Sequence, residues 1–188
     1  MANIWFTSDL HFGHDREFIW KARGFESVEE MNKAIVERFN SKVQPEDTVY
    51  ILGDIMLGDN AVGEYYLSQL NGEKIIILGN HDTGTRKMIY DAYAKEVTFA
   101  KVIKYKKKNI YLSHYPTLTG NMDDEPWHCV LNLHGHTHQV DNFTAGHENY
   151  MFHVGVDSHD CYPVLIDDAI EACREMIREY KESLENEE

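Results

Sequence analysis

Five short polar segments, each placed at the end of an apolar run, carry the residue types that bind metal ions. In chain order they are Asp9–Leu10–His11, Gly53–Asp54, Gly79–Asn80–His81–Asp82, Ser113–His114–Tyr115–Pro116 and His134–Gly135–His136–Thr137–His138. Their carboxylate, imidazole and amide groups suit divalent manganese, iron, zinc, cobalt or nickel. Two Asp, three or four His and one Asn are too many for one ion, and they suffice for two if one carboxylate bridges. Two ions about 3.5–4 Å apart can clamp a phosphate group and generate hydroxide near neutral pH.

Each segment taken alone also has an ordinary structural explanation. Gly53–Asp54 and Gly79–Asn80 are common turn dipeptides, and His114 before Tyr–Pro is compatible with a buried histidine whose hydrogen bonds are satisfied. His136 and His138 are compatible with a solvated loop. The occurrence of all five segments in one chain, each after a strand-like run, favours the functional interpretation, which is hydrolysis of a phosphate ester by two metal ions.

The same five segments resemble, in order, the motifs of the calcineurin-like metallophosphoesterase superfamily, which are written DxH, GD, GNH(D/E), H and GHxH. The resemblance extends from Asp9 to His138, and the chain looks like a small bacterial or phage-type member. Arg23–Gly24–Phe25 and Val154–Gly155–Val156–Asp157 also resemble segments of such short phosphoesterases. The resemblance implies a metal-dependent hydrolase that acts on a phosphomonoester or a phosphodiester.

The resemblance also implies a role for each matched residue. The first metal would be held by Asp9, His11 and His138, the second by Asn80, His114 and His136, and both by the bridging Asp54. A hydroxide bridging the two metals would attack phosphorus in line. His81 would stabilise developing charge or protonate the leaving oxygen, and Asp82 would orient the His81 imidazole. Outside these segments, His14 and Arg23 are candidate contacts of the substrate phosphate, with a surface loop position as the alternative for His14.

The apolar runs between these segments predict an α/β chain. Strands are expected over Asn3–Ser8, Asp47–Leu52, Lys74–Leu78, Val97–Lys106, Asn109–Ser113, Val130–His134, Tyr150–Val156 and Val164–Ile166, and helices over Val28–Phe39, Gly63–Leu70 and Asp167–Leu184. The β-α-β order of the first half predicts parallel strands with helices on their faces. We therefore expect one domain over residues 1–188, with two packed mixed sheets flanked by helices. The resemblance implies the same architecture, as a four-layer αββα sandwich.

The charge of the chain limits the substrates. A formal net charge of -14 disfavours binding to long nucleic acids, because such binding depends on basic patches, although a nucleotide substrate stays open. The basic run Lys104–Tyr105–Lys106–Lys107–Lys108 is interpreted as a hairpin turn or edge strand whose lysines prevent aggregation. A small phosphoester is therefore the expected substrate.

The cysteines, the apolar runs and the N-terminal residues bear on the cellular compartment of the protein. Cys129, Cys161 and Cys173 are few and far apart, which favours a reducing cytoplasm over a disulfide framework. No apolar run approaches the roughly 20 residues that span a bilayer, so no membrane contact is expected. The N-terminal residues read as a buried strand and not as a signal peptide. The oligomeric state is not legible from the sequence.

Two other functions are alternatives to hydrolysis of a small phosphoester. One is a nuclease of the same superfamily, which the acidic composition and the lack of an added domain disfavour. The other is a non-catalytic scaffold, because a retromer subunit uses this fold as an interaction platform with an impaired metal site. The complete ligand set and the presence of His81 favour the enzyme.

Overall fold

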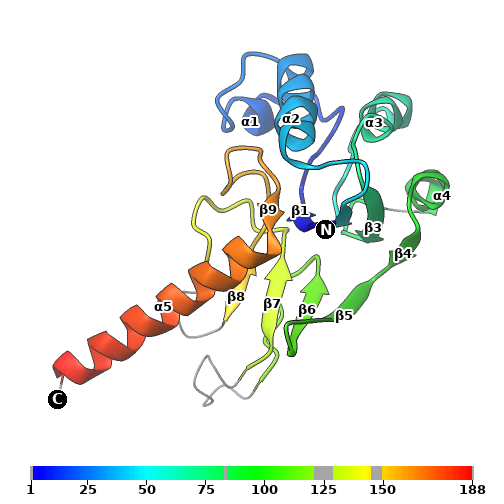
Figure 1. Cartoon of the computed structure of the whole chain (residues 1–188). Coiled ribbons are helices and arrows are strands. Elements are labelled where there is room, and N and C mark those ends of the chain that lie inside the picture. Colours follow the sequence, from blue (N-terminus) through cyan, green and yellow to red (C-terminus); the bar gives the residue numbers. More distant parts are fainter. Residues whose placement is uncertain (1, 83, 121–128, 145–149, 188) are drawn as a thin grey trace.

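The computed structural model describes residues 2–82, 84–120, 129–144 and 150–187 (Figure 1). Within these ranges the helices are α1 (Glu17–Trp20), α2 (Val28–Lys42), α3 (Asn60–Leu67), α4 (Gly84–Tyr93) and α5 (Ile166–Glu187). The strands are β1 (Ile4–Thr7), β2 (Thr48–Ile51), β3 (Glu73–Ile77), β4 (Glu96–Thr98), β5 (Ala100–Tyr105), β6 (Lys108–Ser113), β7 (Leu131–His134), β8 (Met151–His153) and β9 (Val164–Leu165). No helix within the described ranges is long and apolar enough to cross a membrane.

The strands form two mixed sheets. The first has the order β4-β3-β2-β1-β9, in which β1 to β4 are parallel and β9 runs antiparallel to β1. The second has the order β5-β6-β7-β8, in which β5 runs antiparallel to β6 and the other neighbours are parallel. The lysine-bearing β5 is an edge strand of this sheet, as the basic run suggested.

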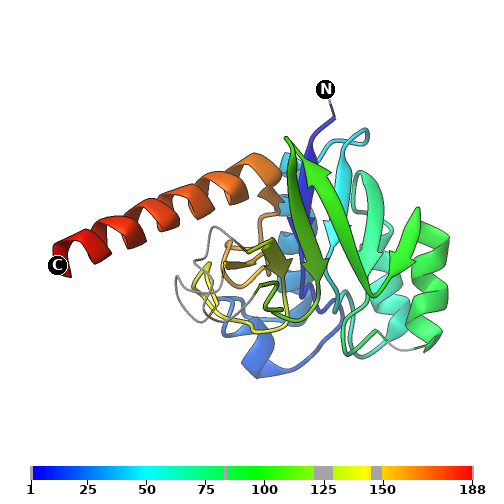
Figure 2. The ribbon, with the colours of Figure 1, turned by 90° about the horizontal axis from the view of Figure 1, so that it is seen from below.

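The two sheets pack face to face, and α1 to α4 cover the outer side of the first sheet (Figures 1 and 2). Alternation along the strands produces this layering, because successive side chains point to opposite faces. Trp5 and Ile51 belong to the core under the helices, whereas Phe6 and Tyr50 belong to the core between the sheets, where their rings stack at 5.4 Å. The expected pair of mixed sheets flanked by helices is confirmed.

Helix α5 packs its apolar stripe onto the core between the sheets, through residues that include Ile170, Cys173 and Met176. Its C-terminal part extends away from the body of the molecule in both views (Figures 1 and 2). Ser27 caps the N-terminus of α2, because its side-chain oxygen accepts a hydrogen bond from the Glu30 backbone N–H.

The structure corrects one expected strand. The run 97–106 is divided at the exposed Phe99 into β4, which joins the first sheet, and β5, which joins the second. The division was not visible in the sequence because apolar periodicity does not identify the partner strand. The hairpin turn lies at Lys106 and Lys107, one residue earlier than expected, and both have the positive φ angles of a tight two-residue turn. Helices α1 and α4 were not expected.

Backbone pairings beyond the strand ends bring the polar segments together. After β1, Ser8 pairs with Gly155, which follows β8, so the two sheets are joined at this edge. The Asp9 and His11 backbone N–H groups donate to the carbonyl oxygens of Gly53 and Asp54, each at 3.0 Å. The first two segments therefore lie side by side, at the edge where β1 and β2 end.

His153 in β8 is a buried histidine held in its neutral form. It is fully buried, its Nδ1 lies 2.8 Å from Ser158 Oγ, and its Nε2 has no hydrogen-bond partner among the described residues. Protonation would place an unpaired N–H and a charge in the interior, and this burial lowers the pKa of His153 to about 3.

This histidine should make the stability of the metal-free protein depend on pH. Below its ordinary pKa of 6.5 the unfolded His153 takes up a proton that the folded state refuses until about pH 3, so acidification favours unfolding. We expect His153→Asn to reduce the fall in unfolding free energy between pH 7 and pH 5, by up to about 1.4 kcal/mol per pH unit. Urea denaturation with chelator present at several pH values measures it.

Ser158→Ala is the matched control, because it removes the partner of Nδ1 and keeps the imidazole. Its pH slope should equal that of the wild type. An identical slope in His153→Asn would contradict the assignment.

Candidate metal centre

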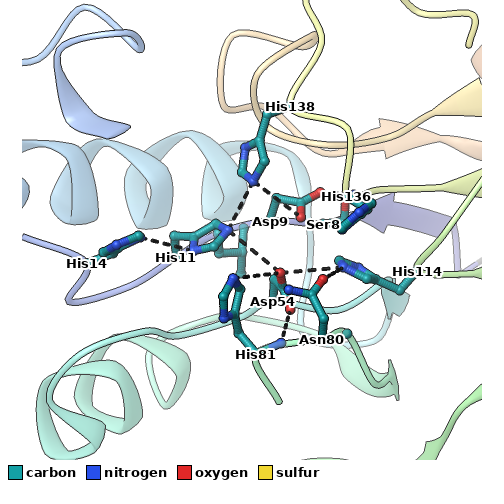
Figure 3. Close-up of polar contacts among 12 residues, drawn as sticks. Ser8, Asp9, His11, His14, Asp54, Asn80, His81, His114, His136 and His138 are labelled. Carbon is teal, nitrogen blue, oxygen red and sulfur yellow. Dashed lines mark hydrogen bonds and ion pairs between the residues drawn. The ribbon is translucent and has the colours of Figure 1, made fainter. Parts of the chain in front are cut away.

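Polar side chains from five strand ends converge on one region of the molecule (Figure 3). They follow β1 (Asp9 and His11), β2 (Asp54), β3 (Asn80 and His81), β6 (His114) and β7 (His136 and His138). Both carboxylates come from the first sheet, whereas the second sheet supplies three imidazoles. The arrangement therefore depends on the packing of the two sheets.

One group of potential ligand atoms, all within 4.8 Å of one another, comes from Asp9, His11 and His138. The Nε2 atoms of His11 and His138 are 3.2 Å apart, and His138 Nε2 lies 3.9 Å from Asp9 Oδ1. Asp9 and His11 are buried, and His138 is half-buried. Two imidazole nitrogens and a carboxylate oxygen directed at one point are a donor set for a divalent cation.

A second group of the same kind consists of Asp9, Asp54 and His114. His114 Nε2 lies 3.4 Å from Asp54 Oδ2 and 2.9 Å from Asn80 Oδ1. His114 Nδ1 is 2.8 Å from the Leu52 carbonyl oxygen, which can only accept, so Nδ1 carries a proton and Nε2 faces the group. The two groups share Asp9, and Asp54 lies between them, because its Oδ2 is also 3.9 Å from His11 Nε2.

His81 lies beside the two groups, and no group found among the described residues includes it. Its side chain is 41% exposed, and its Nε2 is 4.0 Å from Asp54 Oδ2. Its backbone is fixed on both sides, since its N–H donates to Asp54 Oδ1 at 2.9 Å and its carbonyl accepts from Arg86. An imidazole that is open to solvent next to the carboxylates is compatible with the role expected of His81.

Asp82 has partners other than the imidazole that it was expected to orient. Its Oδ2 accepts hydrogen bonds from the backbone N–H groups of Asp54 at 2.7 Å and Gly79 at 2.8 Å. Its Oδ1 accepts from the Tyr90 hydroxyl at 2.6 Å. The chain turns back after Gly79 and buries this carboxylate under the strand ends. Asp82 therefore fixes the backbone that presents Asp54.

His136 lies beside the second group and contacts it through both its imidazole ring and its backbone. Its ring centroid lies 5.0 Å from that of His114 and 4.6 Å from that of Tyr115. Its backbone N–H donates to Asp9 Oδ2 at 2.9 Å. Its expected role as a ligand of the second metal stays a prediction.

The structure assigns Arg23 a role different from the expected phosphate contact. Its side chain is 3% exposed and forms an ion pair with Asp157. The same guanidinium donates to the backbone carbonyls of Asp9 at 2.8 Å and Leu10 at 3.2 Å. The guanidinium is buried and its donors are occupied, so it cannot grip a substrate. His14 is half-buried with Nδ1 3.3 Å from His11 Nδ1, and its contact with phosphate stays a prediction.

Three further residues support the centre without having been assigned to it from the sequence. Ser8 Oγ donates to Asp9 Oδ2 at 2.5 Å, and the Tyr90 hydroxyl donates to Asp82. Asp157 Oδ2 accepts from His138 Nδ1 at 2.9 Å. Only Asp157 had a sequence signal, as part of the Val–Gly–Val–Asp segment that resembles short phosphoesterases.

Burial and mutual contacts shift the pKa values of the clustered side chains. Burial raises the pKa of Asp9 above its usual value. Burial opposes ionisation of Asp54 and His114 as well, but their mutual hydrogen bond holds the pKa of Asp54 low and that of His114 high. Burial also lowers the pKa of His11. The contact between Asp54 and His114 thus opposes part of the cost of burying this carboxylate.

One atom indicates directly that these residues fit a cation. Asp9 Oδ1 is buried and has no hydrogen-bond partner among the described residues. An unpaired buried carboxylate oxygen is costly, and in native proteins it signals an ion or water that completes the site. His138 Nε2 faces this oxygen, so a divalent cation between them would satisfy both.

Two motif glycines are required because ligands from other segments pack against them. A methyl group on Gly79 would overlap Asp54 Oδ1, and one on Gly135 would overlap Ser8 Oγ and Asp9 Oδ2. Each glycine thus makes room for a carboxylate that another strand end supplies. The candidate metal ligands are positioned by contacts between segments that are distant in the chain.

Gly135→Ala should therefore weaken metal binding by displacing Asp9. Overpacking costs about 1–3 kcal/mol, which corresponds to about 5- to 150-fold in affinity if it falls on the ligand. Calorimetric titration of the chelator-treated protein with Mn²⁺ measures the change. Gly84→Ala is the control, since a methyl group there meets nothing within 4 Å. Equal affinities of the two variants would refute the packing argument.

Three proteins of similar length resemble this chain in sequence or structure. An uncharacterized protein of Methanocaldococcus jannaschii is 32% identical over 145 residues, which cover 76% of this chain and 74% of that protein. The gene 66 protein of Mycobacterium phage D29 is 30% identical and covers 98% of this chain and 100% of its own. A protein of unknown function from Aquifex aeolicus superposes with a TM-score of 0.71 at 27% identity, over 92% of this chain and 100% of that one.

The sequence model described as calcineurin-like phosphoesterase matches residues 2–168, a range that includes all five polar segments. The resemblance drawn from the motifs is thus confirmed by a match over most of the chain. The chain belongs to the calcineurin-like phosphoesterase family.

Proposed function

We propose that this protein hydrolyses phosphate esters of small molecules at a centre of two divalent metal ions. The observation that carries the proposal is the pair of donor groups that share Asp9, one with His11 and His138 and the other with Asp54 and His114. Membership of the phosphoesterase family supports the same reaction class. Two such cations, when bound, polarise the phosphoryl oxygens and lower the pKa of a bound water.

The proposed ligands divide between the two ions. The first ion takes Asp9, His11 and His138, and the second takes Asn80, His114 and His136. Asp54 is proposed to serve both, because its Oδ2 lies between His11 Nε2 at 3.9 Å and His114 Nε2 at 3.4 Å. This mixture of oxygen and imidazole donors accepts manganese, iron, zinc, cobalt or nickel.

His81 is the proposed acid or charge-stabilising group. Its imidazole is 41% exposed beside Asp54, so a substrate phosphate at the donor groups would come within its reach. A proton on this ring can be donated to the leaving oxygen as the ester bond breaks. The half-buried His14, which contacts the His11 ring, is the proposed second contact of the phosphate.

The proposed substrate is small. The net charge of -14 disfavours long polyanions, and part of the basic hairpin is neutralised, since Lys101 pairs with Glu96 and Lys106 with Asp167. A nuclease acting on nucleic acid ends is the alternative. We also place the enzyme in the reducing cytoplasm, a proposal that the free, buried thiols of Cys161 and Cys173 support.

The metal requirement leads to the first test. Chelator-treated protein reloaded with Mn²⁺ should bind two equivalents and hydrolyse aryl phosphomonoesters or phosphodiesters. Asp54→Ala should weaken both binding steps, whereas His114→Ala should weaken mainly the second. Elemental analysis, calorimetry and a substrate panel run with several metals provide the measurements. Saturation at one equivalent or none, without activity, would sink the two-metal proposal, and plasmid cleavage faster than small-ester cleavage would favour the nuclease.

The role of His81 leads to a second test. His81→Ala should retain both metals and the fold but lower kcat by roughly 10²–10⁴-fold on an alkyl phosphate, the usual range for a positioned acid or base. The loss should be smaller on a nitrophenyl ester, because a good leaving group depends less on protonation. Loss of a metal, or an unchanged kcat on the alkyl ester, would show that the assignment is wrong.

A further inference from the structure

Arg23 and Asp157 form a buried ion pair directly behind His138. Arg23 Nε donates to Asp157 Oδ1 at 2.8 Å, and Arg23 Nη2 donates to Oδ2 at 3.0 Å. The two side chains are 3% and 13% exposed. The same Oδ2 accepts from His138 Nδ1 at 2.9 Å. The guanidinium, the carboxylate and the imidazole thus form one continuous chain of hydrogen bonds.

This chain of hydrogen bonds determines which nitrogen of His138 can bind a metal. An ionised carboxylate only accepts, so His138 Nδ1 carries the proton and Nε2 keeps its lone pair. Nε2 faces Asp9 Oδ1 at 3.9 Å and His11 Nε2 at 3.2 Å, which is the first donor group. Carboxylates behind metal-bound histidines fix the tautomer and ring orientation and raise the basicity of the ligand.

Arg23 also holds the opposite side of the same donor group. Its remaining donors reach the carbonyl oxygens of Asp9 and Leu10, the residues that leave β1. Arg23 and Asp157 therefore connect the loops that follow β1, β7 and β8, two of which carry first-group ligands. No hydrogen bond or ion pair found among the described residues links Arg23 or Asp157 to Asn80, His114 or His136, the ligands proposed for the second ion.

We propose that Arg23 and Asp157 are positioning residues that set the affinity of the first metal site through His138, and that they act much less on the second site, to which only the Arg23 contact with the shared Asp9 backbone connects them. The inference rests on the proposed two-metal function for the existence of the second site. A purely structural ion pair would stabilise the fold and affect both sites equally. Selectivity between the sites is thus the property that separates the two explanations.

The test compares Asp157→Asn with Asp160→Asn, the same chemical change three residues apart. Asp160 lines the same cavity as His138, but it is 79% exposed and its side chain pairs with Arg38 and not with His138. Mn²⁺ titration calorimetry of chelator-treated protein should show one binding step weakened about 10- to 100-fold in Asp157→Asn and two unchanged steps in Asp160→Asn. Combined with His114→Ala, Asp157→Asn should weaken the step that remains, which identifies it as the first site. Arg23→Lys keeps the positive charge but loses the paired hydrogen bonds to the two oxygens of Asp157, and it should weaken the same step.

Formate rescue provides a second readout. A cavity of about 440 Å³ is lined by Arg23, His138 and Asp157, among others, so a small anion can reach the place of a missing carboxylate. Formate should restore first-site affinity in Asp157→Ala and should not change that of the wild type.

Three outcomes would overturn the inference. They are equal weakening of both steps, no weakening in Asp157→Asn, and weakening of the same size in Asp160→Asn. A single Mn²⁺ equivalent in the wild type would instead refute the proposed two-metal function, and formate rescue of that one step in Asp157→Ala would then decide whether Asp157 positions His138.

Discussion

The burial of two carboxylates in one cluster is the constraint on which the rest of the centre depends. Asp9 and Asp54 are at most 2% exposed, so each loses its hydration while it also repels the other. The chain offsets part of this cost with hydrogen bonds to Asp9 from Ser8 and from the His136 backbone. Asp9 Oδ1 remains without a partner among the described residues. This arrangement is costly as a core polar network and favourable as a pair of cation sites.

The cluster can form only because the two sheets pack with a fixed relative position. The first sheet supplies both carboxylates, and the second supplies His114, His136 and His138. The Ser8–Gly155 pairing joins the sheets at this edge, and the close approach of Gly135 to Asp9 leaves no room for a shift. Since interiors are densely packed, displacement of one sheet against the other would move ligands apart. The packing of the core between the sheets therefore keeps the candidate ligands together.

The sequence could predict the local features of this molecule but not those that depend on distant partners. The strand-end segments with Asp9, Asp54 and His114 were legible because residue type and spacing are local properties. The division of the run 97–106 between two sheets was not legible, since it depends on which strand each half meets. Arg23 looked like a phosphate contact because its partner Asp157 lies 134 residues away. Asp82 was likewise assigned to its neighbour in sequence, although it binds the backbone of Asp54.

The backbone conformation of the candidate ligands explains why spacing alone could not show which of them share a donor group. Five residues of the centre have φ angles between 48° and 69°, namely Asp9, His11, Asp54, His136 and His138. Non-glycine residues in this region cost about 1–3 kcal/mol each and persist only where surrounding contacts determine them. The regular alternation of side chains along a strand therefore stops at these residues. Hydrogen bonds to distant segments determine where their side chains point. Phe18, whose ring contacts that of His14, and Val140, which lines the cavity beside His138, are at least 70% exposed. The buried candidate ligands thus support the reaction class, whereas exposed residues such as these are candidates for contacts with the substrate.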